Sequence, residues 1–458
     1  MRTTENAPGL RMLVRASRRL RASWHGLGPG LVTGVADDDP SGIGTYTVTG
    51  AVYGYRLLWL SIVTLPMTIA VQSICARLGI VTGRGLARTV ARHYGRGWLG
   101  VIVALLFVAN LVNIAADLGA IAAVIAMFVP VPAWLLVAPI GLAIAGTEIV
   151  VPYPQFARVL KALTLVIFAY VIGAFVASPD WGAVLRGTVQ PEVSWDRDTL
   201  MTVVAVLGTT ISPYLFFWQA AQEVEEEQAQ GIRATRLSTR EVRTLTRAAD
   251  LDVATGMVLA NLGFYFVVLT SAATLHAHGM TDVQTPADAA KALQPLAGDL
   301  ATVLFAVGVI GTGLLAVPVL AGSVAYAAAE LFDWPEGLNR TFQRAPQFYG
   351  VILLATLGGV ATVFSPLSPI AALVLAAAVN GVIAPVLLVF LMVVAHDRRI
   401  MHRHRISGTM LAMGWVTTAA MGAAAIAFFA SFRWSSWCRG RTVHHSLMNL
   451  GSERPHLA

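Results

Sequence analysis

The chain has 458 residues, of which 56% are hydrophobic and only 12% are charged. Soluble globular domains carry about 25% charged residues, so this composition excludes a soluble fold and indicates a membrane protein with several spans. The net charge is +7, and the two cysteines, Cys75 and Cys438, provide neither a disulfide framework nor a cysteine-based metal motif.

The first 28 residues form a basic leader. They contain six arginines and no aspartate. They lack a clean apolar core and a small-residue cleavage site, so they are not typical of a targeting peptide. We expect residues 1–28 to be cytoplasmic.

Apolar stretches that are long enough, or nearly so, to cross a bilayer core of about 30 Å follow the leader. Eleven spans are expected, near residues 30–51, 57–80, 99–129, 133–150, 158–178, 200–221, 251–273, 299–328, 349–365, 369–395 and 408–431. Arginines concentrate in alternate loops, which fits a cytoplasmic N-terminus in the plasma (bacterial inner) membrane. The polar tail 432–458 is also arginine-rich and fits this rule poorly, because eleven spans place it outside.

One polar stretch interrupts the first span. The sequence Ala36-Asp37-Asp38-Asp39-Pro40-Ser41-Gly42 places three carboxylates and a proline inside an apolar segment. An ionisable residue at membrane depth costs roughly 2.5–3.5 kcal/mol on insertion scales, so it normally faces a protein interior or a water-filled cavity. Because Pro40 removes a backbone donor, we expect the helix to break here and to leave carbonyls free. The pattern indicates a cation site in a broken transmembrane helix.

The sixth span contains a similar interruption, Gly208-Thr209-Thr210-Ile211-Ser212-Pro213-Tyr214. Taken alone, this segment is equally typical of an ordinary proline kink. Two interrupted helices five spans apart favour an inverted-repeat transporter with a site near the midplane. We predict an all-α integral membrane protein with a transporter domain at 29–431, made of repeat one (about 29–178), repeat two (about 199–395) and an extra helix (about 408–431).

Motifs in the first three spans resemble one transporter family. They are Gly28-Pro29-Gly30, Asp39-Pro40-Ser41-Gly42, Gly54 to Trp59, Ala76 to Gly83 and Ala115-Ala116-Asp117-Leu118. These segments resemble the natural resistance-associated macrophage protein (NRAMP) family of divalent metal transporters, and the similarity covers about residues 25–430. The resemblance implies a LeuT-like inverted repeat of 5+5 helices plus an eleventh, in which spans 1, 2, 6 and 7 rock against the rest.

The sequence departs from the family pattern at the expected metal ligands. The family's Asp-Pro-Gly-Asn motif is Asp-Pro-Ser-Gly here, so Gly42 replaces an asparagine ligand. In span six, Ser212 replaces the methionine ligand and Tyr214 replaces a histidine. The candidate metal ligands therefore present only oxygen; they are Asp39, Ala36, Ser41, Thr209 and Ser212, with Gly42 at the position of the lost asparagine.

Oxygen-only ligands favour a hard cation, whereas a thioether favours softer transition metals. Mg²⁺ keeps several waters and suits a roomy polar site with one or two carboxylates. Both substitutions are expected to enlarge the site, and this sequence resembles a branch of NRAMP-related magnesium transporters that lacks the methionine. We therefore favour Mg²⁺ as the substrate, with Mn²⁺ next.

Further polar residues are candidates for the cavity or a proton path. They are Asp38, Asp117, Tyr214, Gln219 and Asn380. Two roles stay open for Asp37 and Asp38: they add negative potential to the cavity, or they cap the outer half-helix. For Asp117 a buried, hydrogen-bonded carboxylate is the alternative, and for Asn380 an interhelical hydrogen bond. The histidines lie in loops, tails or span ends, and Ala120 replaces the family's glutamate, so we expect weak or absent proton coupling.

The expected function is transport of a divalent cation by alternating access, with the lipid bilayer and the ion as partners and no cofactor. No enzyme motif or nucleic-acid partner is indicated. Three alternatives stay open: a proton-coupled Mn²⁺/Fe²⁺ importer, an organic-solute transporter of the same fold, and a transport-dead metal sensor. The charged segment 222–250 is expected to be a solvated linker, and a sensor would use it for signalling.

Overall fold

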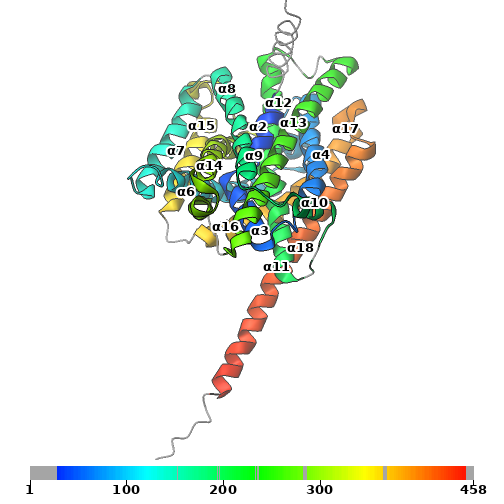
Figure 1. Cartoon of the computed structure of the whole chain (residues 1–458). Helices are drawn as coiled ribbons and strands as arrows, with labels where there is room; N and C mark the ends of the chain where they lie inside the picture. Colours follow the sequence, from blue (N-terminus) through cyan, green and yellow to red (C-terminus); the bar gives the residue numbers. More distant parts are fainter. Residues whose placement is uncertain are drawn as a thin grey trace, which may run out of the picture.

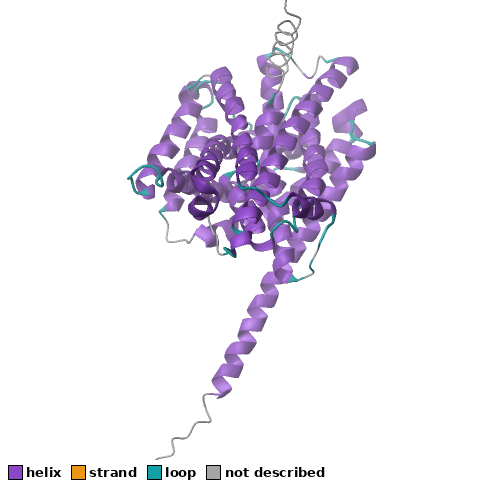
Figure 2. Cartoon of the chain, in the orientation of Figure 1, coloured by secondary structure: helices purple, strands orange, loops and turns teal. Residues whose placement is uncertain are grey.

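The computed structural model describes residues 28–449, except 152, 193, 195, 233, 235, 236, 282–285 and 365–368. In these residues the chain is helical and contains no strand (Figure 2). The helices pack into one bundle, from which the C-terminal helix extends (Figure 1). Residues 1–27 of the basic leader and the last nine residues of the predicted tail lie outside the described part.

Every expected span corresponds to one helix or to a helix pair. They are α2 (Pro29–Ala36) with α3 (Pro40–Tyr53), α4 (Trp59–Thr82), α6 (Gly97–Ile125), α7 (Ala133–Val150), α8 (Tyr153–Leu163) with α9 (Ile167–Val176), α11 (Arg197–Thr210) with α12 (Pro213–Ala229), α13 (Thr239–Thr274), α14 (Pro286–Phe332), α15 (Pro346–Val363), α16 (Pro369–His396) and α18 (Gly408–Asn449). Short helices α5 (Leu86–Tyr94), α10 (Trp181–Val189) and α17 (Arg398–Met401) lie in the connections.

Among the described residues, nine helices are long and apolar enough to cross a membrane. The broken pair α2–α3 and the shorter apolar segment Ile383–His396 of α16 complete the eleven expected spans. In α14 the backbone leaves the helical region at Gly298, where φ is +81°, so its membrane-crossing part is Gly298–Phe332. Helix α18 continues through Asn449, so the predicted boundary at residue 431 is not the end of a helix.

The helices form two groups that meet at the breaks. Helix α13 packs against α2, α3 and α4, and α12 also packs against α4. We call α2, α3, α4, α11, α12 and α13 the four-span bundle. Helix α6 packs against α14, α15 and α16. We call these four helices the scaffold.

Glycines allow α2 and α13 to touch through their backbones. A Cβ atom built on Gly34 would overlap the backbone of Gly256, and a Cβ on Gly30 would lie 2.6 Å from the backbone nitrogen of Val253. The amide of Gly30 also donates to the Asp252 carboxylate at 2.7 Å, which holds the N-terminus of α2 on α13. Helix α2 is therefore firmly attached to the four-span bundle.

This close approach makes Gly34 sensitive to a single methyl group. We expect Gly34→Ala to destabilise the protein by about 1–3 kcal/mol, because overpacking forces the two backbones apart. The matched control is Gly119→Ala on α6, since nothing lies within 4 Å of a Cβ at that position. Thermal unfolding in detergent measures both variants, and equal melting temperatures would refute the close-packing argument.

The segment 222–250, expected to be a soluble, amphiphilic or helical linker, is largely helical, but its expected solvation is wrong for the acidic run at its start. Helix α12 continues to Ala229 and α13 already begins at Thr239. The carboxylate of Glu225 is buried and accepts hydrogen bonds from the amide of Leu338 at 3.0 Å, from the amide of Asn339 and from the hydroxyl of Tyr326. The acidic run is therefore not fully solvated, because Glu225 binds backbone amides in the connection that follows α14.

Candidate metal site

The break in the first span is built around Asp39. Helix α2 ends at Ala36, and Pro40 is the first residue of α3, where its missing N–H costs nothing. Asp39 is the N-cap of α3: its Oδ1 atom accepts from the amide of Gly42 at 2.6 Å and from the hydroxyl of Ser41 at 2.7 Å. The alternative in which Asp37 or Asp38 caps this half-helix is therefore wrong.

The break in the sixth span has a similar form. Helix α11 ends at Thr210, and Pro213 begins α12, so Ile211 and Ser212 lie between two half-helices. The Ser212 hydroxyl donates to the carbonyl of Thr209 at 2.8 Å. Ser212 also lies close to the carboxylate of Asp37. The predicted interruptions of both helices are confirmed.

The two breaks lie against each other. The Tyr214 hydroxyl donates to the carbonyl of Ala36 at 2.9 Å, which joins the second break to the first. A Cβ atom on Gly42 would lie 2.9 Å from the Thr209 hydroxyl oxygen, so only glycine fits there without displacing Thr209. The structure thus brings the predicted ligands together, but in this conformation the carbonyls of Ala36 and Thr209 already accept hydrogen bonds.

On the scaffold side, Asp117 of α6 approaches the first break. Its Oδ1 atom accepts from the amide of Ser41 at 3.3 Å, and its Oδ2 atom is buried without a hydrogen-bond partner. Asp39, Ser41 and Asp117 form what we call the scaffold-facing group. It contains two carboxylates at the boundary between the four-span bundle and the scaffold.

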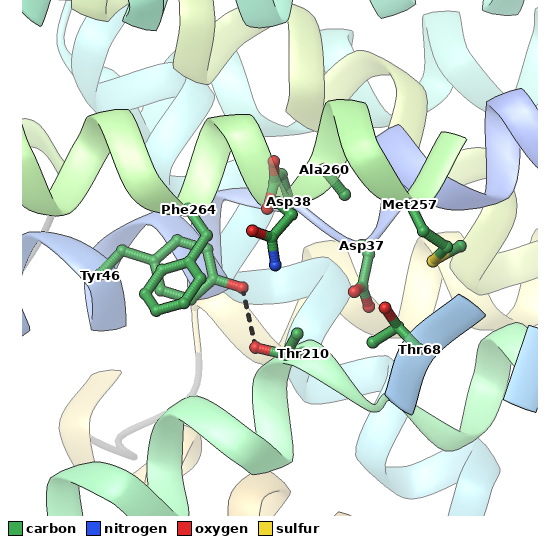
Figure 3. Close-up of a pocket in the computed structure, with 9 residues that line it drawn as sticks. Asp37, Asp38, Tyr46, Thr68, Thr210, Met257, Ala260 and Phe264 are labelled. Atoms are coloured by element: carbon green, nitrogen blue, oxygen red, sulfur yellow. Dashed lines mark hydrogen bonds between the residues drawn. The ribbon is translucent and has the colours of Figure 1, made fainter. Parts of the chain in front are cut away.

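A small cavity lies on the other side of the first break, inside the four-span bundle (Figure 3). We call it the bundle-facing cavity; its lining residues are Asp37, Asp38, Tyr46, Thr68, Thr210, Met257, Ala260, Asn261 and Phe264. It has room for about one water-sized sphere, so a bare cation fits in this conformation but a fully hydrated one does not. Gly42 and Ser212 do not line this cavity, so the enlarged site expected from their substitutions stays a prediction.

The carboxylates at the break have no basic counter-charge. In the part of the chain that the structure describes, the ion pairs involve Arg77, Arg88 and Arg96, and none includes an aspartate of the break or Asp117. These aspartates are nevertheless buried, with at most 3% of each exposed. Buried carboxylates require protons or a bound cation to offset their charge.

Two predicted cavity residues lie away from the bundle-facing cavity. The amide of Gln219 on α12 donates to Glu223 at 2.9 Å, and Asn380 on α16 has a buried Oδ1 atom without a hydrogen-bond partner. Among the described residues, no three histidine, cysteine, aspartate or glutamate side chains gather into a metal cluster. Any metal site here thus depends on hydroxyl, amide and carbonyl oxygens as well as carboxylates.

Sequence reasoning missed two residues that line the cavity, Thr68 of α4 and Met257 of α13. Thr68 and Met257 belong to no polar motif, and only the folded structure places them beside the first break. Met257 is also a thioether, a ligand type that the predicted oxygen-only set excludes.

Comparison with known proteins identifies the family. The family model described as "Natural resistance-associated macrophage protein-like" (Nramp) matches residues 30–431. The chain belongs to the Nramp family. Among curated relatives, the "Divalent metal cation transporter MntH" of Deinococcus radiodurans is 31% identical over 342 residues, which cover 71% of this chain and 74% of the relative. The protein of the same name from Pectobacterium carotovorum is 28% identical over 356 residues, 75% of this chain and 82% of the relative.

Solved structures agree on the fold of this Nramp chain. A manganese transporter from Eremococcus coleocola superposes with a TM-score of 0.71 at 18% identity, covering 94% of this chain and 88% of that chain. Mhp1, a nucleobase-cation-symport-1 family transporter, superposes with a TM-score of 0.57 at 16% identity, covering 89% and 92%. The predicted LeuT-like architecture with two broken helices is confirmed.

Proposed function

We propose that this Nramp protein moves a divalent metal cation across the plasma membrane by alternating access. The observation that carries the proposal is the meeting of two broken helices at Asp39, beside a second buried carboxylate on the scaffold, Asp117. Two curated relatives bear the name divalent metal cation transporter, which supports the same substrate class. The N-terminus is proposed to be cytoplasmic, in line with the arginine-rich leader and loops.

The proposed ion site lies between the two breaks. Asp39 supplies the charge, and the further ligands are the carbonyl of Ala36, the hydroxyl of Ser41 and, from α11 and its break, Thr209 and Ser212. Opening this site requires Tyr214 to release the carbonyl of Ala36 and Ser212 to release that of Thr209, since both are occupied in the present conformation. Both contacts lie within the four-span bundle, so releasing them requires the half-helices of that bundle to move relative to one another.

We favour Mg²⁺, with Mn²⁺ next, because every proposed ligand between the breaks is oxygen. A second candidate is a proton-coupled importer of Mn²⁺ or Fe²⁺, and the observation in its favour is the thioether of Met257 in the neighbouring cavity. An organic anion is disfavoured because three successive aspartates would repel it. No resident cofactor is required, since the transported ion is the substrate.

Weak or absent proton coupling is part of the proposal. The described histidines, such as His93 on α5 and His276 after α13, lie at span ends or in connections. Ala120 stands on α6 one turn after Asp117, where the family pattern has a glutamate. A proton that accompanied the ion would have to use the aspartates of the break or Asp117.

Flux into proteoliposomes tests both parts of the proposal. Mg²⁺ and Mn²⁺ uptake would be measured separately, in competition with Ca²⁺ and Cd²⁺, while a trapped dye reports internal pH. We expect Mg²⁺ entry without acidification. Mn²⁺ entry with acidification and without Mg²⁺ entry would replace the proposal by the proton-coupled importer, and absence of both Mg²⁺ and Mn²⁺ uptake would overturn transport of these ions.

A further inference from the structure

The three successive aspartates of the first break face two different compartments. Asp39 belongs to the scaffold-facing group through Ser41, whose hydroxyl donates to Asp39 and whose amide donates to Asp117. Asp37 and Asp38 instead line the bundle-facing cavity (Figure 3). A loop between two half-helices has no helical period, so adjacent residues can point in different directions.

Each of the two bundle-facing carboxylates has one buried oxygen without a hydrogen bond. Asp37 Oδ1 and Asp38 Oδ2 are buried without any hydrogen bond, and each residue is only 2% exposed. Asp38 Oδ2 packs directly on the backbone of Gly263 in α13, where a Cβ atom would overlap it. Leaving a charged oxygen unsatisfied costs more than the roughly 1–3 kcal/mol of a neutral buried group, so the cavity is built for something that binds these oxygens.

The hydroxyl groups of the cavity direct their protons away from it. Thr68 donates to helix carbonyls of α4 at 3.0 and 3.2 Å, and Thr210 donates to the carbonyl of Val206 at 2.6 Å. The Tyr46 hydroxyl lies 3.4 Å from the Thr210 oxygen, and since the Thr210 proton is committed, Tyr46 donates there. The lone pairs of both threonines thus remain for the cavity, apart from the one that Tyr46 uses.

The amide of Asn261 follows the same rule. Its nitrogen donates one N–H to the Thr64 hydroxyl at 3.2 Å, and its carbonyl oxygen is the acceptor that it can offer to the cavity. The cavity therefore offers oxygen acceptors from the first break, α4, α11 and α13, and one sulfur from Met257. Such a lining suits a cation and repels an anion.

We propose that the bundle-facing cavity is a second cation site, which binds a divalent ion through Asp37 and Asp38. The two carboxylates of the cavity would balance the charge of one divalent ion. The cavity admits about one water-sized sphere, so the second ion binds stripped of most of its water. The inference takes the ion class from the proposed function but does not depend on Asp39.

Counting bound Mn²⁺ tests this site separately from the proposed transport site. The full-length protein in detergent would be titrated with MnCl₂, and free Mn²⁺ would be followed by electron paramagnetic resonance. We expect two ions per wild-type chain, one in the Asp37→Asn/Asp38→Asn double variant and one in Asp39→Asn. Asp198→Asn removes an exposed carboxylate from the first turn of α11 and should retain two.

The other outcomes separate the two proposals. One ion in the wild type that persists in the double variant overturns the second site and leaves the proposed function standing. One ion that is lost in the double variant and persists in Asp39→Asn supports the bundle-facing site and overturns the role of Asp39. A wild type that binds no Mn²⁺ overturns the second site and removes Mn²⁺ from the proposed substrates.

Single neutral substitutions keep the test decisive if the double variant does not fold. Thr210→Val and Asn261→Leu each remove one acceptor and no charge, so the weaker of the two Mn²⁺ dissociation constants should rise about tenfold, equivalent to about 1.4 kcal/mol. Thr255→Val is the matched control, because it removes a hydroxyl of α13 that does not line the cavity. A tenfold effect in the control and none in the cavity variants would also overturn the proposal.

Discussion

Asp39→Asn is expected to reduce divalent-ion flux by about 100-fold or more while the protein remains folded. The substitution removes the only charge that the proposed ligand set places between the breaks, and contacts to a charged group are worth about 1.5–3 kcal/mol each. Asparagine is as good an N-cap as aspartate, so α3 keeps its first turn and the bonds from Ser41 and Gly42. Initial flux in proteoliposomes and the melting temperature in detergent measure the two effects.

Two further variants separate the ligand from the cap. Asp39→Ala loses both functions, so we expect the same loss of flux together with destabilisation of about 0.5–2 kcal/mol. Asp198→Asn should change neither, since that side chain is exposed at the start of α11. Near-normal flux in Asp39→Asn would mean that the transported ion does not bind this carboxylate. Asp37 and Asp38 would then be the candidate ligands.

Sequence reasoning predicted the architecture because strong local signals carry it. Pro40 and Pro213 each lack the backbone N–H that would continue the hydrogen bonds of the preceding half-helix. Polar residues surround both prolines inside apolar spans. Non-helical backbone at membrane depth occurs only where it is buried in protein or lines a water-filled cavity, so both breaks are expected to lie inside the fold. The positions of the spans follow from the apolar runs for the same reason.

The directions of the side chains at the break could not be predicted in the same way. Periodicity assigns a face to a residue in a helix, but Asp37 and Asp38 lie between two helices, where no period applies. Their partners across the cavity, Thr68 and Met257, come from helices whose sequence is otherwise apolar. The burial of Glu225 was missed because its partners follow more than a hundred residues later, in the connection after α14.

Ser212→Met is expected to raise the flux ratio of Mn²⁺ or Cd²⁺ to Mg²⁺ by at least about tenfold, equivalent to about 1.4 kcal/mol. The variant restores a soft thioether at the second break, next to Asp37 and the carbonyl of Thr209, and such a ligand favours Mn²⁺ and Cd²⁺ over Mg²⁺. The longer side chain also takes space from a hydrated ion, which acts in the same direction. Competition between the ions in proteoliposomes gives the ratio.

Ser212→Leu is the control for size, since leucine fills a similar volume without sulfur. If Ser212→Leu shifts the ratio as much as Ser212→Met, volume and not ligand chemistry sets the selectivity. Met257→Leu complements it, because it removes the one thioether of the bundle-facing cavity and leaves the second break unchanged. A loss of Mn²⁺ flux in Met257→Leu alone would show that the ion draws its soft ligand from α13, and the oxygen-only argument for Mg²⁺ would then fail.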